Sequence, residues 1–535
     1  MEWPSENPFA INSPLSSVVS RWASETTVRT DLENLCVFIE SSRDKLVDVC
    51  EWLVVQANYK LATLIAQENE KDWLLRYIFY GDFGCGQVHV SLHLAKSYAS
   101  APSISTQVHA ADWHEREIED LFGLTFEGHP RLGDFVLHEQ WPEGVNPMRS
   151  DFDATRPYLH KEIRPEWQPL RIFQASGAFV MPIGPVYSDY AESAQFSLET
   201  VGEDVVRTTP RFFYKYRGLE KLAEGQPIER VVLMAERFSG TAAFAHSLAF
   251  CQAVEKISGF EPNSRVQSLR TLLAELERLR SHVSAIAGIC KSTALAVAAS
   301  QASILEEELL RLSCVLTGHR YLFGVNVPGG LTFNISDEDC SDLASTVTEV
   351  VKRLGVLHGT LRSSSSFLDR LEEVGIVSES DATSYGLVGP VARASGVARD
   401  LRKVLPYASY NLHLQFNTPL EYAGDGYARL RILFSETEES SEIIRQIASR
   451  MPPGDLVLED FKITPGEGLG WVEAPSGAAF HWVKIEENGR VERYSVTPPS
   501  FMNWHGFHLA AENFAFQDFP IILATFGLSC AECDR

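Results

Sequence analysis

Residues 269–290 read LRTLLAELERLRSHVSAIAGIC, and this stretch decides the class of the larger part of the chain. Its apolar side chains recur at the i, i+3, i+4, i+7 spacing that lines one face of an α-helix. The apolar positions are Leu269, Leu272, Leu273, Leu276, Leu279, Val283 and Ile286. Residues 304–316 and 343–361 repeat the spacing. This half of the chain is therefore predicted to be mainly a helical bundle.

Short strands are expected on both sides of this bundle. Residues 480–486 and 490–496 flank Asn488-Gly489, a pair typical of a tight β-hairpin turn. Nearer the N-terminus, a helical pattern covers residues 43–56, and strand patterns cover residues 35–40, 60–66, 73–80 and 87–94. We predict an α+β fold: a small mixed sheet-and-helix domain, followed by a mainly helical domain with short β-elements.

A proline-rich stretch separates the two parts. Pro157, Pro165 and Pro169 lie among charged residues there, and proline breaks regular secondary structure because it has no backbone N–H. We predict a first domain over residues 1–153, a connector over 154–175 and a second domain over 176–535.

Charge and composition exclude several classes of partner. The net charge of −24 argues against a nucleic-acid surface and against direct adsorption to anionic lipid. The nine cysteines have no framework spacing, which favours a reducing compartment. We expect no signal peptide, and no stretch of 18 uninterrupted apolar residues occurs. Any membrane association must come through a partner.

Residues 112–123, DWHEREIEDLFG, predict a helix with a distinct start and stop. Asp112 and Glu115 resemble a capping box, and Gly123 can end the helix. The apolar face would hold Ile118, Leu121 and Phe122. We expect the acidic run at residues 115–119 to lie at a surface or an interface.

The segment from 113 to 151 resembles the 30-kDa-type subunit of respiratory complex I, the C subunit in bacteria. The residues that carry the resemblance are Trp113-His114-Glu115-Arg116-Glu117, Asp120-Leu121-Phe122-Gly123, Phe126-Glu127-Gly128-His129-Pro130 and Pro147-Met148-Arg149-Ser150-Asp151. This resemblance implies that the first domain has the fold of that protein.

The rest of the chain resembles the large subunit shared by complex I (the 49-kDa type) and group 4 [NiFe]-hydrogenases. The matching residues include Tyr216-Arg217-Gly218-Leu219-Glu220-Lys221, Glu236-Arg237-Phe238-Ser239-Gly240, Glu275-Leu276-Glu277-Arg278, Thr317-Gly318-His319-Arg320, Gly389-Pro390-Val391-Ala392-Arg393 and the terminal Cys530-x-x-Cys533. Fusion of both parts in this order is most similar to the large subunit of formate hydrogenlyase-type complexes.

The resemblance implies a metal site, and this sequence departs from it. In the hydrogenases, two C-x-x-C pairs hold nickel and a bridging iron. Cys530 and Cys533 match one pair, but Ser239 and Ala242 stand where the other pair belongs. Alanine cannot bind a metal and a neutral hydroxyl is a poor ligand for a soft one, so the nickel–iron pair is predicted to be absent. Alternatively, Cys530 and Cys533 are packing thiols or a redox disulfide.

Two further positions depart from the family pattern. The family's Pro-Arg-Gly, whose arginine hangs over the active site, reads Pro475-Ser476-Gly477. Tyr187 replaces the histidine that complex I places near its quinone headgroup. The chain thus resembles the scaffold more closely than either known chemistry.

Glu236, Arg237 and His246 are the candidate catalytic residues. Glu236 could carry protons, or it could be a surface or ion-paired carboxylate, and Arg237 could pair with it in a buried structural bridge. His246 could relay protons or fill a helix–helix contact. The charged residues on 269–290 are open to a simpler interpretation, a solvated helix face with i,i+3 pairs; they are Glu275, Glu277, Arg278 and Arg280.

Three functions follow from the resemblance. The chain would be the large redox subunit of a membrane-associated hydrogenase- or NADH-quinone-oxidoreductase-like assembly, a non-catalytic scaffold in such a complex, or an active hydrogenase component. The implied partners are a small iron–sulfur subunit and membrane-embedded subunits, with NAD or quinone entering only at the level of the complex. The implied location is cytoplasmic, peripheral on the inner face of the cell membrane.

Overall fold

The computed structural model describes residues 14–31, 35–82, 84–158, 177–187, 192–411, 414–456 and 461–535. The chain divides into two compact units. The first holds residues 1–170, 211–216 and 384–386, and the second holds residues 171–210, 217–383 and 387–535. Most of the predicted connector, residues 159–175, lies outside the described residues.

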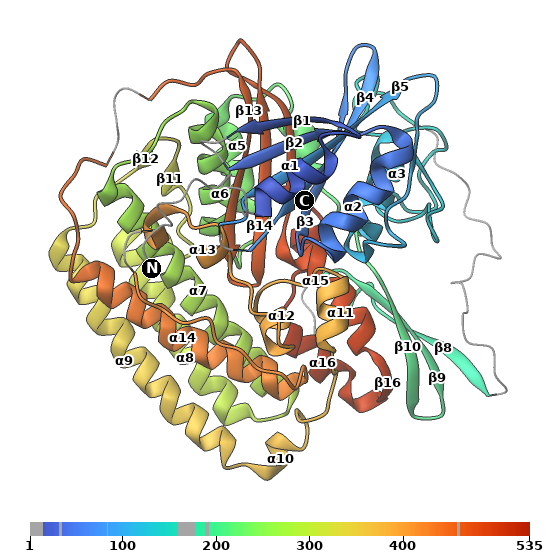
Figure 1. Ribbon diagram of the computed structural model, residues 1–535. Coiled ribbons are helices and arrows are strands. Elements are labelled where there is room, and N and C mark those ends of the chain that lie inside the picture. The colour runs from blue at the N-terminus through green and yellow to red at the C-terminus, as the bar shows by residue number, and fades with distance from the viewer. Residues whose placement is uncertain are drawn as a thin grey trace. The chain divides into compact units, whose positions relative to one another are not determined.

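The first unit is built on a five-stranded mixed sheet (Figure 1). Its strands are β1 (Thr27–Asp31), β2 (Cys36–Glu40), β3 (Lys60–Glu68), β4 (Asp72–Tyr80) and β5 (Gln87–Ala95), in the order β1-β2-β5-β4-β3. Strands β2 and β5 are parallel, and the other neighbours are antiparallel. The four predicted strands are confirmed. Strand β1 was not predicted, because its residues TVRTD are polar and largely exposed.

Helices and one further strand pair complete this unit. The elements are α1 (Pro14–Trp22), α2 (Leu46–Val55), α3 (Asp112–Phe122), β6 (Ser100–Pro102) and β7 (Thr125–Glu127). Helix α3 ends as predicted, because Gly123 adopts the left-handed conformation with φ of 73°. The apolar face of α3 is buried as expected.

The acidic run on α3 is mostly buried, which corrects the expectation of a surface feature. Glu115 is completely buried and accepts hydrogen bonds from the Ser103 hydroxyl at 2.5 Å and the Ile104 N–H at 2.8 Å. Asp120 accepts the N–H groups of three consecutive residues, 135 to 137, at 2.7–3.0 Å. A buried carboxylate needs hydrogen-bond donors around it. Glu115 and Asp120 therefore hold loops in place and do not expose their charge to solvent.

The predicted helical bundle is confirmed in the second unit. Four long helices lie side by side in Figure 1: α7 (Ser264–Ser292), α8 (Ala296–Thr317), α9 (Asp337–Arg362) and α14 (Gly426–Ala448). Their apolar faces share one core. Side-chain caps start three of them: Asn263 on α7, Ser336 on α9 and Asp425 on α14.

The remaining helices are α4 (Leu219–Ala223), α5 (Ile228–Arg237), α6 (Ala243–Ile257), α10 (Ser365–Leu368), α11 (Glu379–Ser384), α12 (Gly389–Ala394), α13 (Leu401–Val404), α15 (Pro499–Ala510), α16 (Phe519–Phe526) and α17 (Cys530–Cys533).

Short sheets accompany the bundle, as predicted. The strands are β8 (Ala178–Ile183), β9 (Gln195–Val201), β10 (Asp204–Arg211), β11 (Asn326–Val327), β12 (Gly330–Leu331), β13 (Gly466–Ala474), β14 (Gly477–Ile485), β15 (Val491–Thr497) and β16 (Glu512–Ala515). The hairpin expected around Asn488-Gly489 joins β14 to β15. Strand β13 adds a third antiparallel member to that sheet. None of the helices in the described ranges is long and apolar enough to cross a membrane.

Helix α6 packs directly against the glycine-rich strand β13. A Cβ atom at Gly470 would lie 1.9 Å from the backbone oxygen of Ala249, so only glycine fits at this contact. Gly468 is similarly crowded by Ala253 and Ile257 of the same helix. This close approach holds α6 on the β13–β14–β15 sheet.

Replacing Gly470 by alanine is expected to lower the free energy of unfolding by about 2 kcal/mol, because the added methyl group must push the helix from the sheet. Urea titration monitored by circular dichroism measures this loss. The matched control is Gly288→Ala in α7, where an added Cβ meets nothing within 4 Å. That control should be neutral or stabilise the chain by about 0.5–1 kcal/mol. Equal effects of the two substitutions would contradict the contact.

Candidate functional site

The C-terminal segment contacts the loop between α5 and α6. The hydroxyl of Ser239 donates a hydrogen bond of 2.9 Å to Oε1 of Glu532, which lies between the two C-terminal cysteines. The other carboxylate oxygen, Oε2, accepts the N–H of Ser500 at 3.3 Å. Ser239 and Glu532 are both buried. The C-terminal motif therefore lies against the loop that carries Ser239.

Arg217 and Glu192 hold the same segment from its two sides. Arg217 donates from Nη2 to the carbonyl oxygen of Phe238 at 2.9 Å and from Nε to that of Asp534 at 3.0 Å. It also donates to the carbonyl oxygen of Ala531. Glu192 accepts the Ala531 N–H at 2.7 Å and the Ser529 hydroxyl at 2.8 Å. The C-terminal turn is therefore fixed by hydrogen bonds that require no metal.

Cys530 and Cys533 are completely buried on α17. Burial raises the pKa of the Cys533 thiol well above its ordinary value, and a thiol must lose its proton to bind a metal. The matching positions on the other side hold the Ser239 hydroxyl and the Ala242 methyl group. Within the described ranges, no three His, Cys, Asp or Glu side chains are grouped as ligands for one ion. The residues present do not fit nickel held by four thiolates.

Glu236 and Arg237 differ in their surroundings. Glu236 is only 1% exposed, and its carboxylate accepts the Gly324 N–H at 2.8 Å. Burial raises the pKa of Glu236. Nε of Arg237 lies 3.2 Å from the Glu236 carboxylate, but more than half of the Arg237 side chain is exposed. The two residues pair at the end of α5, with the carboxylate inside and the guanidinium outside, so the pair is not the buried bridge that was expected.

His246 belongs to a line of buried polar groups. Its Nδ1 lies 2.9 Å from Nε2 of His481 on β14, and Nδ1 of His481 lies 2.7 Å from the hydroxyl oxygen of Tyr494 on β15. On its other side, Nε2 of His246 lies 3.8 Å from Oε1 of Glu532. His246, His481, Tyr494 and Glu532 are all completely buried. The structure thus connects His246 to the C-terminal site.

Glu532, His481 and Tyr494 are not among the residues predicted from the sequence. Glu532 had a visible signal, since it stands between the two cysteines that the resemblance singles out. His481 and Tyr494 stand in the predicted hairpin, where a polar residue in an apolar strand gave only a weak signal. These two residues line up with His246 only because α6 packs against the sheet. No local sequence pattern predicts that packing.

The charged residues of α7 are buried, so the interpretation of a solvated helix face is wrong. Glu277 accepts the N–H groups of Phe244 and Ala245 at 2.8 and 2.9 Å, at the start of α6. Arg280 donates to the carbonyl oxygens of Gly240 and Thr241 at 3.2 and 3.0 Å. Helix α7 therefore supports the loop that carries Ser239 and Ala242.

A second group of buried charges crosses the unit from α7 to α14. Arg393 donates to Glu436 at 2.7 Å and to Glu473 at 2.8 Å, and His282 lies 2.8 Å from the other oxygen of Glu436. Further along, Arg402 lies between Asp400 and Glu275 at 2.6 and 3.0 Å. The Arg393 and His282 contacts hold the pKa of Glu436 well below its usual range. This network joins five elements of the unit through its core.

Glu277 is expected to contribute stability that is lost as pH rises from about 4.5 to about 7. Burial raises the pKa of Glu277 from 4.5 to about 7. The folded state therefore holds a proton that the unfolded state has released, so stability is lost as pH rises through this range. The loss from this group is about 3 kcal/mol at 1.36 kcal/mol per unit.

Unfolding titrations at pH 5 and pH 8 test this pH dependence. Glu277→Gln should reduce the stability difference between the two pH values by about 3 kcal/mol, because an amide does not titrate in this range. Exposed Glu487→Gln is the matched control and should leave the difference as in the parent chain. A parallel pH dependence in Glu277→Gln and the parent would contradict the assignment.

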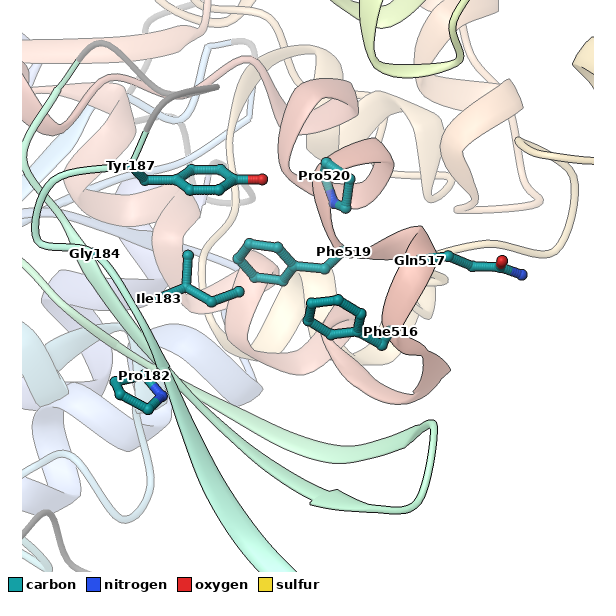
Figure 2. A pocket seen from close by; sticks show the side chains of 8 residues that line it. All are labelled: Pro182, Ile183, Gly184, Tyr187, Phe516, Gln517, Phe519 and Pro520. Atoms are coloured by element: carbon teal, nitrogen blue, oxygen red, sulfur yellow. The ribbon is translucent and has the colours of Figure 1, made fainter.

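An apolar pocket of about 390 Å³ lies beside β8 and the start of α16. It is lined by Pro182, Ile183, Gly184, Tyr187, Phe516, Gln517, Phe519 and Pro520. Figure 2 shows Tyr187, Ile183 and Phe519 pointing toward one another, while the Gln517 side chain points away. Tyr187 supplies a hydroxyl to an otherwise apolar wall. Such a pocket suits a flat apolar ligand that carries one polar group.

Two family profiles match the chain. The profile of the respiratory-chain NADH dehydrogenase 30 kDa subunit matches residues 39–158. That of the 49 kDa subunit matches residues 296–467 and 454–535. Both matches agree with the resemblances found in the sequence.

Individual relatives extend the match over nearly the whole chain. Formate hydrogenlyase subunit 5 of Escherichia coli is 28% identical over 91% of this chain and 87% of its own length. Hydrogenase-4 component G of the same organism is 30% identical over 81% of this chain and 75% of its own length. The C/D subunit of NADH-quinone oxidoreductase from Bdellovibrio bacteriovorus is 26% identical over 95% of this chain and 94% of its own length. The chain therefore belongs to the family that unites hydrogenase-4 component G and formate hydrogenlyase subunit 5 with the C/D subunits of NADH-quinone oxidoreductase.

Proposed function

We propose that this chain is the large redox subunit of a membrane-associated complex, that it docks an iron–sulfur partner, and that it works without a nickel site. The hydrogen bond from Ser239 to Glu532 carries this proposal. A hydroxyl and a carboxylate of the chain itself meet at the position where the resemblance implies nickel thiolates. The relatives are named as parts of hydrogenase, formate hydrogenlyase and NADH-quinone oxidoreductase assemblies, which supports the class of complex.

The pocket beside Tyr187 supports a quinone-like acceptor. Its aromatic and aliphatic walls suit a ring, and the Tyr187 hydroxyl could donate a hydrogen bond to a ring oxygen. Membrane-embedded partners would place the chain on the inner face of the membrane without a span of its own. The alternatives are a non-catalytic scaffold in the same kind of complex and an active hydrogenase component.

Purification of the native complex tests the three functions together. The proposal expects nickel far below one atom per chain, iron in the partner, and reduction of a short-chain quinone or an artificial acceptor. Tyr187→Phe should raise the KM for the quinone several-fold, because one donor to the ligand is lost. Exposed Tyr422→Phe is the control and should leave KM unchanged.

Each alternative has its own outcome. Stoichiometric nickel, with hydrogen-dependent dye reduction lost in Cys530→Ala, would establish the hydrogenase and overturn the proposal. An intact complex that binds its partners but reduces no acceptor would establish the scaffold.

A further inference from the structure

His246, His481 and Tyr494 form one hydrogen-bonded line inside the second unit. The line joins helix α6 to strands β14 and β15, at contacts of 2.9 and 2.7 Å. All three side chains are 0% exposed. Two histidine rings in direct N···N contact away from water must share a hydrogen, since each buried ring nitrogen needs a donor or acceptor opposite it.

The carboxylate of Glu532 determines which group donates and which accepts in each hydrogen bond of this line. Nε2 of His246 lies 3.8 Å from Glu532 Oε1 and has no hydrogen-bond partner among the described residues. A bare nitrogen lone pair facing a carboxylate would be repelled, so Nε2 of His246 carries a hydrogen. Nδ1 of His246 is then the acceptor and Nε2 of His481 the donor, which leaves Nδ1 of His481 to accept the Tyr494 O–H. Each hydrogen in the line thus points toward Glu532.

Charged groups lie near both ends of this line. Glu220 on α4 is next to its Tyr494 end, where Arg493 and Arg535 lie 3.1 and 3.3 Å from the Glu220 carboxylate. At the other end, the Phe238 ring packs 4.4 Å from the His246 ring, and Ser239 donates to Glu532. Burial, with the nearby His246 and Arg535, lowers the pKa of His481 well below its ordinary value. Positive charge is therefore disfavoured on His481, whereas the His246 ring faces the Glu532 carboxylate.

We propose that the His246–His481 pair is a buried proton acceptor, which takes one proton from water and holds it on His246 beside Glu532. No bond between heavy atoms forms or breaks. After uptake, His246 carries hydrogen on both ring nitrogens, and His481 accepts at Nε2 and donates from Nδ1 to the Tyr494 oxygen. Tyr494 keeps its own hydrogen, which rotates away from His481. Release of the proton restores the original direction of the line. In the complex, and resting on the proposed redox function, this site accepts the proton that accompanies electron transfer.

The isolated full-length chain tests the site independently of any redox activity. With ¹⁵N-labelled histidine side chains, nuclear magnetic resonance should show one N–H···N coupling between two rings. His481→Gln and His246→Gln should abolish the coupling, and exposed His93→Gln should retain it. As the pH falls, one ring of the pair should become an imidazolium while the chain stays folded. A missing coupling, or a pair that remains neutral until the chain unfolds, would overturn the proposal.

Glu532→Gln provides a variant that keeps the shape of the site. Removal of the facing negative charge should lower the proton affinity of the pair by about tenfold or more, whereas a merely structural role predicts an unchanged titration. In the purified complex, His481→Gln should slow acceptor reduction by a similar factor and alter its pH profile, with partner content unchanged. If the parent complex reduces no acceptor while the isolated chain shows the titrating pair, the proposed function fails and the proton site stands.

Discussion

Arg393→Met is expected to lower the free energy of unfolding by about 3–5 kcal/mol, because it leaves two buried carboxylates without their shared cation. Arg393 is completely buried and donates to both Glu436 and Glu473. Methionine fills much of the space but carries no charge. Urea or thermal unfolding of the purified chain measures the loss.

Arg353→Met is the matched control for this prediction. Arg353 pairs with Glu308 at 2.7 Å, but both side chains are more than a third exposed. Water already solvates these two charges, so the control should cost less than about 1 kcal/mol. Adding Glu436→Gln to Arg393→Met should recover part of the lost stability, because one uncompensated charge is then removed. Similar small losses at both arginines would show that the core does not depend on the network.

Glu532→Ala is expected to lower the free energy of unfolding by about 4 kcal/mol and to loosen the C-terminus. Each buried donor left without an acceptor costs about 1–3 kcal/mol. The substitution leaves the buried Ser239 hydroxyl and the Ser500 N–H without their acceptor. Glutamine keeps an acceptor oxygen, so Glu532→Gln should cost much less. Unfolding titrations give the energies, and hydrogen exchange at residues 528–535 reports the loosening. Equal stability of the two variants would mean that the carboxylate does not hold this segment.

Glu532 is part of both proposals, the absence of a nickel site and the buried proton acceptor. Glu532 joins Ser239 to the C-terminal turn and faces His246 on its other side. Introducing cysteines at the two positions that lack them, with Ser239→Cys and Ala242→Cys, would remove the hydroxyl donor. It would leave the Glu532 carboxylate in place. We therefore expect thiols alone not to restore a hydrogenase site, and metal analysis of the double variant checks this.

Local patterns predicted much of the fold because they depend on neighbours in the chain. The period of 3.6 residues marked α7, α8 and α9, and alternation with turn residues marked β2 to β5 and the β14–β15 hairpin. The same kind of signal failed for β1, whose side chains are polar, and for the glycine-rich strand β13. These strands form through pairing with partners, which a sequence window does not contain.

The candidate site also has features that the sequence predicts and features that only the structure shows. The sequence by itself determined the family, the two cysteines, and the absence of thiols at Ser239 and Ala242. Only the tertiary structure decided what replaces those thiols and which charges are buried, because both depend on atoms brought together from distant segments. Glu532 meets Ser239 across 293 positions, and His246 meets His481 across 235. Burial turns such polar residues from solvated surface groups into obligatory partners, since a polar group removed from water must find its hydrogen bond inside the protein.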